Sequence, residues 1–251
     1  MMTMRTNLEE YDNPELYDFE NNGYSADVSF LLKWAEQVDG VIVDLACGTG
    51  RATLPLAEKG HLMIGVDIHT GMLEQAKKKS SNLPVKWVEQ DCTALRLDVT
   101  SKMIYMVGNS FQHFLTNMEQ DQLLSAVHHH LEDNGIFIFG TRFPNKEELL
   151  QPAIEEFWRS YRDPSSGEKV DVYTISEYDA LKQIQHYTTI RKAQDGSESR
   201  TGISLRYVYP QEMQRLAEAN GFSLLHMFSD WHESPISSDS LEMICVLQKK
   251  G

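Results

Sequence analysis

Two glycines after an apolar run form the part of this sequence best suited to binding a nucleotide-like ligand. Residues 41–53 read V-I-V-D-L-A-C-G-T-G-R-A-T, so the run leads through Asp44 to Gly48 and Gly50. A glycine has no Cβ, which lets the backbone approach a ligand closely, and the helix N-terminus that follows offers free N–H groups. A dinucleotide-binding turn has the spacing G-x-G-x-x-G, but the three residues after Gly50 include no glycine. The spacing therefore argues against a dinucleotide.

Two further aspartates follow the next two apolar runs. Asp67 ends its run in G-V-D-I-H, about 20 residues after the glycine turn. A carboxylate at this position can accept both hydroxyls of a ribose, or it can cap the helix that follows. Asp91 follows the third run, where it is either a ligand contact or an ordinary loop residue. Cys92 adjoins no cation in the sequence, so we predict packing rather than nucleophilic chemistry for its thiol.

The pattern D-x-x-x-G-x-G at the end of a first strand resembles the first motif of class I (Rossmann-like) S-adenosylmethionine-dependent methyltransferases of the small-molecule type. The resemblance covers most of the chain and implies S-adenosylmethionine as cofactor and S-adenosylhomocysteine as product. In that family the residue matching Asp67 binds the ribose, and the residue matching Asp91 binds the adenine amino group. The resemblance implies cofactor contacts for Tyr17, Tyr24, Asp44, Ala46, Gly48, Gly50, Asp67, Ile68, Met72, Asp91, Cys92 and Asn109.

The stretch G-N-S-F-Q-H-F after the fourth apolar run, residues 108–114, resembles an N-S-F-x-H motif of methyltransferases that modify amino sugars and related metabolites. It holds His113, which we predict to be the catalytic acid–base group because a histidine pKa near ~6.5 suits proton transfer. The alternative is a histidine that only lines the pocket. Two positions depart from the family pattern: Ala46, where many members have glycine, and Met103, where many have aspartate.

Three tyrosines in the N-terminal segment form a second group. Residues 14–38 show helical spacing, with Gly23 between two short helices. In similar enzymes an N-terminal helix folds over the cofactor, which implies cofactor contacts for Tyr17 and Tyr24 and a catalytic contact with the acceptor for Tyr11. The alternative is ordinary packing of an amphipathic helix.

The acceptor site is predicted from one cation and several aromatic residues. Arg142 directly follows the fifth apolar run in G-T-R-F-P-N, where it can bind an anionic substrate group or pair with surface acids. Trp158, Tyr187 and Tyr207 are expected to contact the substrate, and Trp231 can join them in an aromatic pocket. Ordinary packing is the alternative for each aromatic residue.

The elements that must position these residues alternate between strand and helix from residue 41 to 141, which implies an α/β fold with a doubly wound, mostly parallel seven-stranded sheet. Two strands near the C-terminus complete that sheet. The predicted elements are strands 41–46, 61–67, 85–90, 103–108, 136–141, 222–228 and 242–248, and helices 51–59, a helix capped by Thr70, 119–131 and 210–220.

We expect a single methyltransferase domain over residues 1–251, with an antiparallel insertion after the fifth strand. The insertion is predicted to have about three strands, at 170–175, 181–193 and 203–209, with a turn at Asp195-Gly196. Placed over the C-terminal ends of the parallel strands, where ligands bind in such sheets, it would act as a substrate lid. The predicted parts are an N-terminal helical cap (1–40), a cofactor-binding core (41–142), the inserted lid (143–209), and a C-terminal helix and strands (210–251).

Charge and composition exclude several functions. The chain has 23 basic and 37 acidic residues and a formal net charge of −14, so it repels phosphate backbones and nucleic acid is not expected as a partner. The run Lys77-Lys78-Lys79 is interpreted as a solvated helix end. We find no apolar run that would make a signal peptide or a membrane span, and therefore expect a cytoplasmic protein without a membrane partner.

Metal binding is not expected either. The three cysteines include no C-x-x-C pair, and successive residues of His128-His129-His130 point about 100° apart on a helix, so they cannot converge on one ion. The sequence therefore predicts a methyltransferase that acts on an N or O atom of a small-molecule acceptor by in-line displacement, as a monomer or homodimer. The alternatives are a protein or RNA methyltransferase, a non-catalytic S-adenosylmethionine-binding module and, more remotely, an NAD-linked oxidoreductase.

Overall fold

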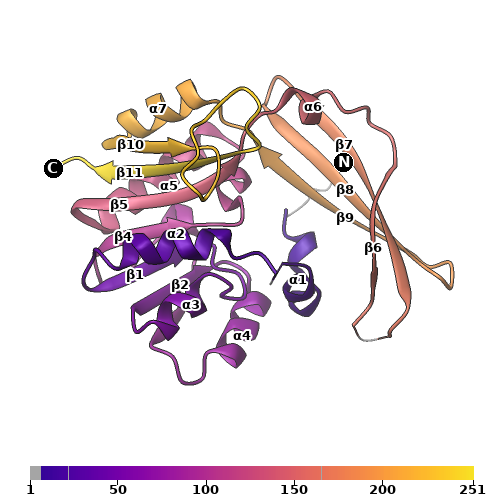
Figure 1. Cartoon of the computed structure of the whole chain (residues 1–251), viewed down its shortest axis with the longest axis horizontal. Helices are drawn as coiled ribbons and strands as arrows, with labels where there is room; N and C mark the ends of the chain where they lie inside the picture. Colours follow the sequence, from indigo (N-terminus) through magenta and orange to yellow (C-terminus); the bar gives the residue numbers. More distant parts are fainter. Residues whose placement is uncertain (1–6, 22, 165) are drawn as a thin grey trace.

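Strand β1 (Val41–Leu45) lies near the middle of a seven-stranded sheet in the computed structural model, which describes residues 7–21, 23–164 and 166–251. The strand order is β10-β11-β5-β4-β1-β2-β3, and the five strands from β5 to β3 are parallel (Figure 1). The elements of this half are β1, α3 (Thr53–Glu58), β2 (Leu62–Asp67), α4 (Thr70–Lys79), β3 (Val85–Glu89), η2 (Cys92–Ala94), β4 (Ser101–Met106), η3 (Ser110–His113), α5 (Asn117–His130) and β5 (Leu131–Arg142).

Two hydrophobic layers cover the two faces of this sheet. Val43 and Leu45 pack with residues of α5 on one face, whereas Ile42 packs with residues of α2 (Ala26–Ala35) and α3 on the other. Strands buried on both faces are nearly continuous apolar runs, which is why β1 and β4 are recognisable in the sequence. The fold is therefore the predicted doubly wound α/β arrangement, and the carboxyl ends of its parallel strands share one edge.

The C-terminal elements complete the sheet as expected. They are α7 (Pro210–Ala219), β10 (Phe222–Phe228) and β11 (Glu242–Lys249), and β11 pairs antiparallel with both β5 and β10. Strand β5 begins at Leu131, five residues before the predicted start at residue 136. Asn134, which has a left-handed conformation (φ 61°), lies within the strand and does not separate it from α5. The predicted N-cap of α4 at Thr70 was wrong, because His69 precedes the helix and its Nδ1 accepts the Met72 N–H at 3.3 Å.

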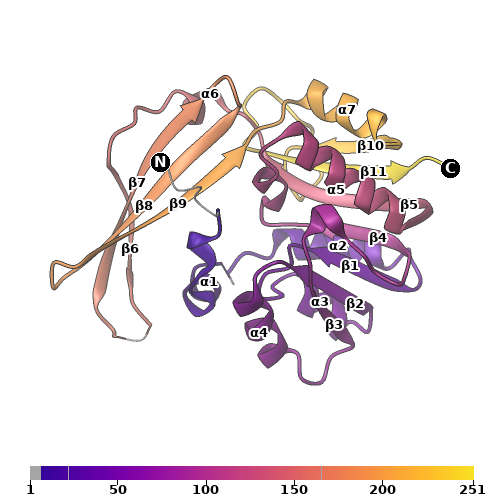
Figure 2. The same ribbon diagram turned by 180° about the vertical axis from the view of Figure 1, so that it is seen from behind.

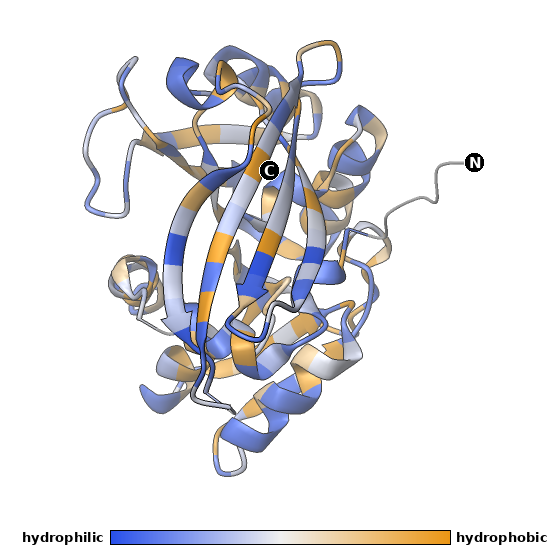
Figure 3. Cartoon of the chain, turned by 90° about the vertical axis from the view of Figure 1, so that its right-hand side faces the viewer, coloured by the Kyte–Doolittle hydropathy of each residue, from blue (hydrophilic) through white to orange (hydrophobic). Residues whose placement is uncertain are grey.

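The insertion forms a separate antiparallel sheet of four strands in the order β6-β7-β8-β9. The strands are β6 (Glu156–Arg162), β7 (Lys169–Asp179), β8 (Ile184–Ala193) and β9 (Glu198–Arg206), and the predicted turn at Asp195-Gly196 lies between the last two. Strand β6 was not predicted because it is a polar edge strand whose Trp158 is 58% exposed. Figure 3 views the second sheet from its side of the molecule, with apolar and polar residues interspersed along the strands.

A short N-terminal segment lies between the two sheets (Figures 1 and 2). It comprises η1 (Glu9–Tyr11) and α1 (Pro14–Asn21), and we call residues 7–21 the N-terminal strap. The short helix α6 (Lys146–Leu149) leads from β5 towards the second sheet. Residues 1–6 of the predicted helical cap lie outside the described residues. Each helix of the part that the structure describes is too short or too polar to cross a lipid bilayer.

Candidate active site

The glycine turn after β1 is built from residues with positive φ angles. Ala46, Gly48 and Gly50 have φ angles of 53°, 55° and 83°. A Cβ on Gly50 would lie 2.7 Å from Cη2 of Trp87, a residue of β3, so only glycine fits there. A Cβ on Gly48 would make an ordinary contact of 3.9 Å with the Tyr17 ring. Gly50 therefore closes the turn onto the sheet, while Gly48 leaves backbone open beneath Tyr17.

Asp44 lies under this turn, inside the protein. It is fully buried, and its Oδ2 accepts a hydrogen bond from Thr53 Oγ1 at 2.6 Å. Burial raises the pKa of Asp44 to about 7, against the hydrogen bond from Thr53 that lowers it. Asp44 thus ties β1 to the first turn of α3, so it shapes the turn from below.

Asp67, at the end of the second strand, is hydrogen-bonded to the glycine turn that follows the first strand. At the end of β2, its Oδ2 accepts the Gly48 N–H at 2.8 Å and its Oδ1 accepts the His69 N–H at 2.8 Å. Burial raises the pKa of Asp67, and these backbone N–H groups oppose the shift. A carboxylate oxygen has a second lone pair, so both oxygens can still accept ribose hydroxyls.

The residues predicted to surround an adenine lie at the ends of β2 and β3. Ile68 is half-exposed at the edge of the sheet, whereas the Met72 side chain is buried against it on α4. Asp91 is exposed, and its Oδ1 accepts hydrogen bonds from Thr93 N at 2.8 Å and Thr93 Oγ1 at 2.7 Å, which begins η2. Cys92 is buried, and burial raises its pKa to about 12, so it stays a thiol. Ile68 and Asp91 are thus the exposed members of this group.

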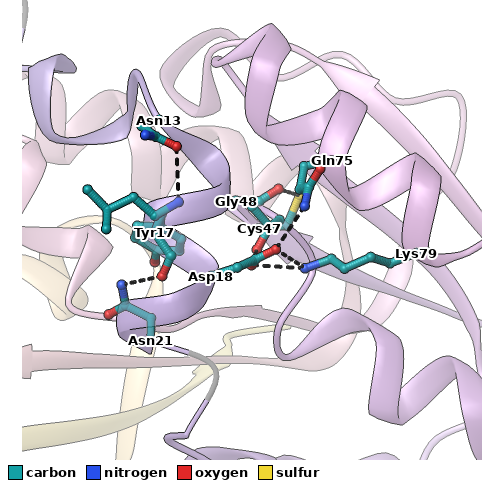
Figure 4. Close-up of polar contacts among 10 residues, drawn as sticks. Asn13, Tyr17, Asp18, Asn21, Cys47, Gly48, Gln75 and Lys79 are labelled. Atoms are coloured by element: carbon teal, nitrogen blue, oxygen red, sulfur yellow. Dashed lines mark hydrogen bonds and ion pairs between the residues drawn. The ribbon is translucent and has the colours of Figure 1, made fainter. Parts of the chain in front are cut away.

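The strap is fastened to the glycine turn by Asp18, which the sequence analysis missed (Figure 4). Asp18 is buried, and it accepts hydrogen bonds from Thr49 Oγ1 at 2.5 Å and Lys79 Nζ at 2.9 and 3.0 Å. Gln75 Nε2 adds a longer contact of 3.3 Å. These contacts hold the strap against the turn, so that the Tyr17 ring lies over Gly48.

Tyr24 takes a different position from Tyr17. It is exposed beyond the strap, and the Arg51 guanidinium lies 5.5 Å from its ring centre. Arg51 forms two hydrogen bonds with the buried Asp27, at 2.9 and 2.5 Å. Burial, together with Glu242 and Asp27, raises the pKa of Tyr24 to about 12. Tyr24 therefore packs on the residue that follows Gly50 rather than on the open side of the turn.

His113 meets the strap at the end of β4. The preceding loop turns sharply, with φ angles of 67° at Gly108 and 59° at Asn109, which brings η3 under the strap. His113 Nε2 lies 2.8 Å from Tyr11 Oη, and His113 Nδ1 lies 3.0 Å from Asn7 Nδ2. Burial lowers the pKa of His113 to about 4, so its imidazole is neutral at pH 7.

Three of the four predicted substrate residues gather around one carboxylate that the sequence analysis missed. Glu148 of α6 forms an ion pair with Arg142 Nη2 at 2.5 Å and accepts a hydrogen bond from Tyr187 Oη at 2.7 Å. Burial and Glu148 raise the pKa of Tyr187 to about 12, and the pKa of the neighbouring Tyr207 is raised further, mainly by burial. This cluster joins the end of β5 to the inner face of the second sheet.

The remaining aromatic residues lie elsewhere. The Trp158 ring is mostly exposed on β6, 4.4 Å from the Arg159 guanidinium carbon. Trp231 is buried in the core, with its ring centre 5.5 Å from that of Phe30. The aromatic pocket expected from the sequence is therefore reduced to Tyr187 and Tyr207.

The second sheet is tied to the strap by ion pairs. Glu10 accepts hydrogen bonds from Arg191 Nη2 at 2.9 Å and Thr201 Oγ1 at 2.5 Å, and Glu20 pairs with Arg159 at 2.6 Å. Arg191 also lies 3.9 Å from Glu20. The strap thus binds the glycine turn through one side and the insertion through the other.

A surface cleft lies away from these residues, between η2 and α5. Its volume is about 780 Å³, and no predicted site residue lines it. Of the three consecutive histidines, His129 and His130 both line the cleft, with ring centres 5.0 Å apart, and His130 is also bonded to Ala126 O and Leu97 N. His128 instead packs beneath Gly221.

Comparison with known proteins finds similarity in the core of the chain and along most of its length. Residues 42–135 match the family model of the methyltransferase domain. A putative methyltransferase of Geobacillus sp. (strain WCH70) is 26% identical, over 90% of this chain and 93% of its own length. The cypemycin N-terminal methyltransferase of a Streptomyces species is 26% identical, over 94% of this chain and 95% of its own.

Solved structures share the whole fold. An S-adenosylmethionine-dependent methyltransferase from Clostridium acetobutylicum ATCC 824 has a TM-score of 0.79 at 19% identity, covering 94% of this chain and 97% of its own. The S-adenosylmethionine-bound CalS10, an amino pentose methyltransferase from Micromonospora echinaspora, has a TM-score of 0.73 at 16% identity, covering 96% and 98%. At these identities the likeness establishes the fold, including the second sheet.

Proposed function

We propose that this chain, a class I S-adenosylmethionine-dependent methyltransferase, transfers the methyl group to a nitrogen or oxygen atom of a small-molecule acceptor. The observation that carries the proposal is the enclosure of the edge beside the glycine turn. The strap and the second sheet are bonded to each other there through Glu10, Glu20 and Arg191. An enclosed edge of this kind suits a small acceptor, and the acidic surface disfavours RNA.

The residues at this edge fit S-adenosylmethionine. Gly48 leaves backbone accessible under the Tyr17 ring, and Asp67 has lone pairs for two ribose hydroxyls. The exposed Asp91 carboxylate can accept a hydrogen bond from the adenine amino group, with Ile68 beside the adenine ring. Asn109 has a strained backbone at the end of β4, next to where the transferred methyl would lie.

When bound, the cofactor would supply a methyl group on a sulfonium, from which in-line attack by an acceptor lone pair forms the new C–N or C–O bond as the C–S bond breaks to give a neutral thioether. The chain's own task is alignment of the acceptor and exclusion of water. Tyr11 and His113 are proposed as the catalytic contacts, because they adjoin the end of β4 beneath the strap. An amine acceptor that arrives neutral becomes an ammonium product and releases its proton to solvent.

We further propose that the second sheet is the substrate lid and that Arg142, Tyr187 and Tyr207 orient the acceptor. A guanidinium, two phenol groups and the Glu148 carboxylate lie close together here. They offer hydrogen-bond donors and acceptors to a polar acceptor molecule. Trp158 is proposed to act at the lid's outer edge, where its exposed ring can contact an acceptor only if the lid moves.

Amine acceptors are the first to test, since an amino pentose methyltransferase shares this fold and an N-terminal methyltransferase is similar in sequence. The first experiment measures thermal shifts with S-adenosylhomocysteine and with NAD. At 100 times the dissociation constant a ligand adds about 2.7 kcal/mol of stability, or roughly 2–4 °C for a protein of this size. We expect a shift with S-adenosylhomocysteine and none with NAD.

The second experiment measures S-adenosylhomocysteine formation with a panel of amino sugars, amino acids, short peptides, phenols and a structured RNA. We expect turnover with a small amine or hydroxyl compound, and loss of turnover in Tyr11→Phe/His113→Ala with cofactor binding retained. Turnover with RNA alone would overturn the proposal. Cofactor binding with no turnover on any acceptor class would favour a binding module.

A further inference from the structure

We propose that Asn7 is a positioning residue that fixes the tautomer of His113. As a consequence, the Tyr11 hydroxyl donates a hydrogen bond to the acceptor and does not remove a proton from it. The inference about the acceptor rests on the proposed function. The tautomer itself follows from four interatomic distances within the strap, η3 and β9.

The first step is the orientation of the Asn7 amide. Asn7 Oδ1 accepts the Ser204 N–H at 2.6 Å, and Asn7 Nδ2 donates to Ser204 O at 2.9 Å. A flipped amide would place an oxygen against the Ser204 carbonyl and an NH₂ against its N–H group, so both hydrogen bonds would be lost. The backbone of β9 therefore fixes which amide atom is the nitrogen.

The second step is the proton of His113. The fixed nitrogen, Asn7 Nδ2, lies 3.0 Å from His113 Nδ1, and an amide NH₂ can only donate. His113 Nδ1 must therefore accept, and a neutral imidazole that accepts at Nδ1 carries its hydrogen on Nε2. Burial of His113 keeps the ring neutral, in agreement with this assignment.

The third step is the direction of the Tyr11 hydroxyl. His113 Nε2 lies 2.8 Å from Tyr11 Oη, so the Nε2–H group donates and the phenol oxygen accepts. The hydrogen of the Tyr11 hydroxyl then points away from His113. Burial raises the pKa of Tyr11, and the nearby Tyr17, Glu10 and Asp67 raise it further, so the group remains a phenol.

The chemical consequence concerns the acceptor. A phenol that already accepts from His113 offers a donor, which suits a hydroxyl or carbonyl oxygen next to the reacting atom and leaves the lone pair of a reacting amine free for attack. Neither ring nitrogen of His113 is free to take a proton from an ammonium, because Nδ1 is occupied by Asn7 and Nε2 already carries hydrogen. The pair therefore orients a neutral nucleophile, and deprotonation precedes binding.

The test is the ¹⁵N spectrum of the His113 ring in the full-length protein, with and without S-adenosylhomocysteine. The His113 signals are assigned by their loss in His113→Gln. We expect hydrogen on Nε2 and none on Nδ1 between pH 6 and 8. Hydrogen on Nδ1 would overturn the inference. The spectrum needs no acceptor, so it stays informative even if the proposed function fails.

Asn7→Asp tests whether Asn7 imposes the tautomer. A carboxylate accepts from Nδ1–H, so we expect the hydrogen to move to Nδ1 and Tyr11 to become the donor to Nε2. With an amine acceptor, kcat/KM should fall roughly 5- to 10-fold, the range expected for one lost hydrogen bond. A new pH-dependent limb should also appear near neutrality as the His113 pKa rises.

The matched control is Asn13→Asp in the same strap. Within the described residues, Asn13 Oδ1 accepts a single hydrogen bond, from the Leu16 N–H at 3.0 Å, so this variant adds the same charge without touching His113. We expect its tautomer and pH profile to match those of the unmodified protein. Tyr11→Phe gives the second comparison: hydrogen that stays on Nε2 supports Asn7 as the cause, whereas a changed tautomer would assign the effect to Tyr11 and overturn the inference.

Discussion

Gly50 is required by what lies under it as well as by its backbone conformation. It has a φ of 83°, and a Cβ would lie 2.7 Å from Trp87 Cη2. Gly50→Ala should therefore add left-handed strain and overpacking, together about 2–4 kcal/mol of lost unfolding free energy, measured by urea denaturation. Gly40→Ala is the control, since Gly40 has a φ of 92° with nothing within 4 Å of a Cβ. Equal losses in both variants would show that Trp87 contributes nothing.

His113 makes stability depend on pH in a defined direction. Burial lowers its pKa from 6.5 to about 4, so the folded protein binds fewer protons than the unfolded chain between these values. The contribution is fully present above pH 6.5 and is lost as pH falls towards 4, by up to about 3 kcal/mol. His113→Gln should flatten the unfolding free energy over this range, as measured by urea denaturation at several pH values. An unchanged slope would mean that His113 stays accessible to protons in the folded state.

At the scale of a single element, we propose that the strap controls access to the cofactor site. Asp18 fastens α1 to Thr49 and Lys79, and Tyr17 covers Gly48. Asp18→Asn should leave the parallel sheet intact but release S-adenosylhomocysteine about 5- to 20-fold faster, as expected for lost charged hydrogen bonds. Release can be followed by stopped-flow fluorescence of Trp87 beneath the turn. Asp12→Asn, which alters an exposed strap residue, should leave the release rate unchanged.

The elements of the core are readable from the sequence because each strand is an apolar run between turn residues. Burial on both faces makes β1 and β4 stand out, and Asp44, Gly48, Gly50 and Asp67 follow at fixed offsets. Strand β6 lacks that signal, since an edge strand is selected for pairing with β7 and not for burial.

The sequence analysis missed several site residues for a different reason. Asn7, Asp18 and Glu148 act through partners that are distant in the sequence: Asn7 and Ser204, for instance, are 197 residues apart. A polar residue on a short helix has no local feature that distinguishes such a contact from a solvated surface position. Spacing could therefore single out candidates for direct ligand contact, but not the residues that hold those candidates in place.

At the scale of the whole molecule, the net charge of −14 acts on acceptors before they reach the site. A negative surface attracts small cations and repels anions, and this attraction weakens as the Debye length falls from about 30 Å at 0.01 M salt to about 10 Å at 0.1 M. For an acceptor that approaches the protein as a cation and loses its proton before it binds at the site, KM should therefore rise several-fold over this range. A neutral acceptor of similar size should show no such change. A KM that rises equally for both would place the salt effect on the strap's ion pairs, such as Glu10 with Arg191, and not on the approach of the acceptor.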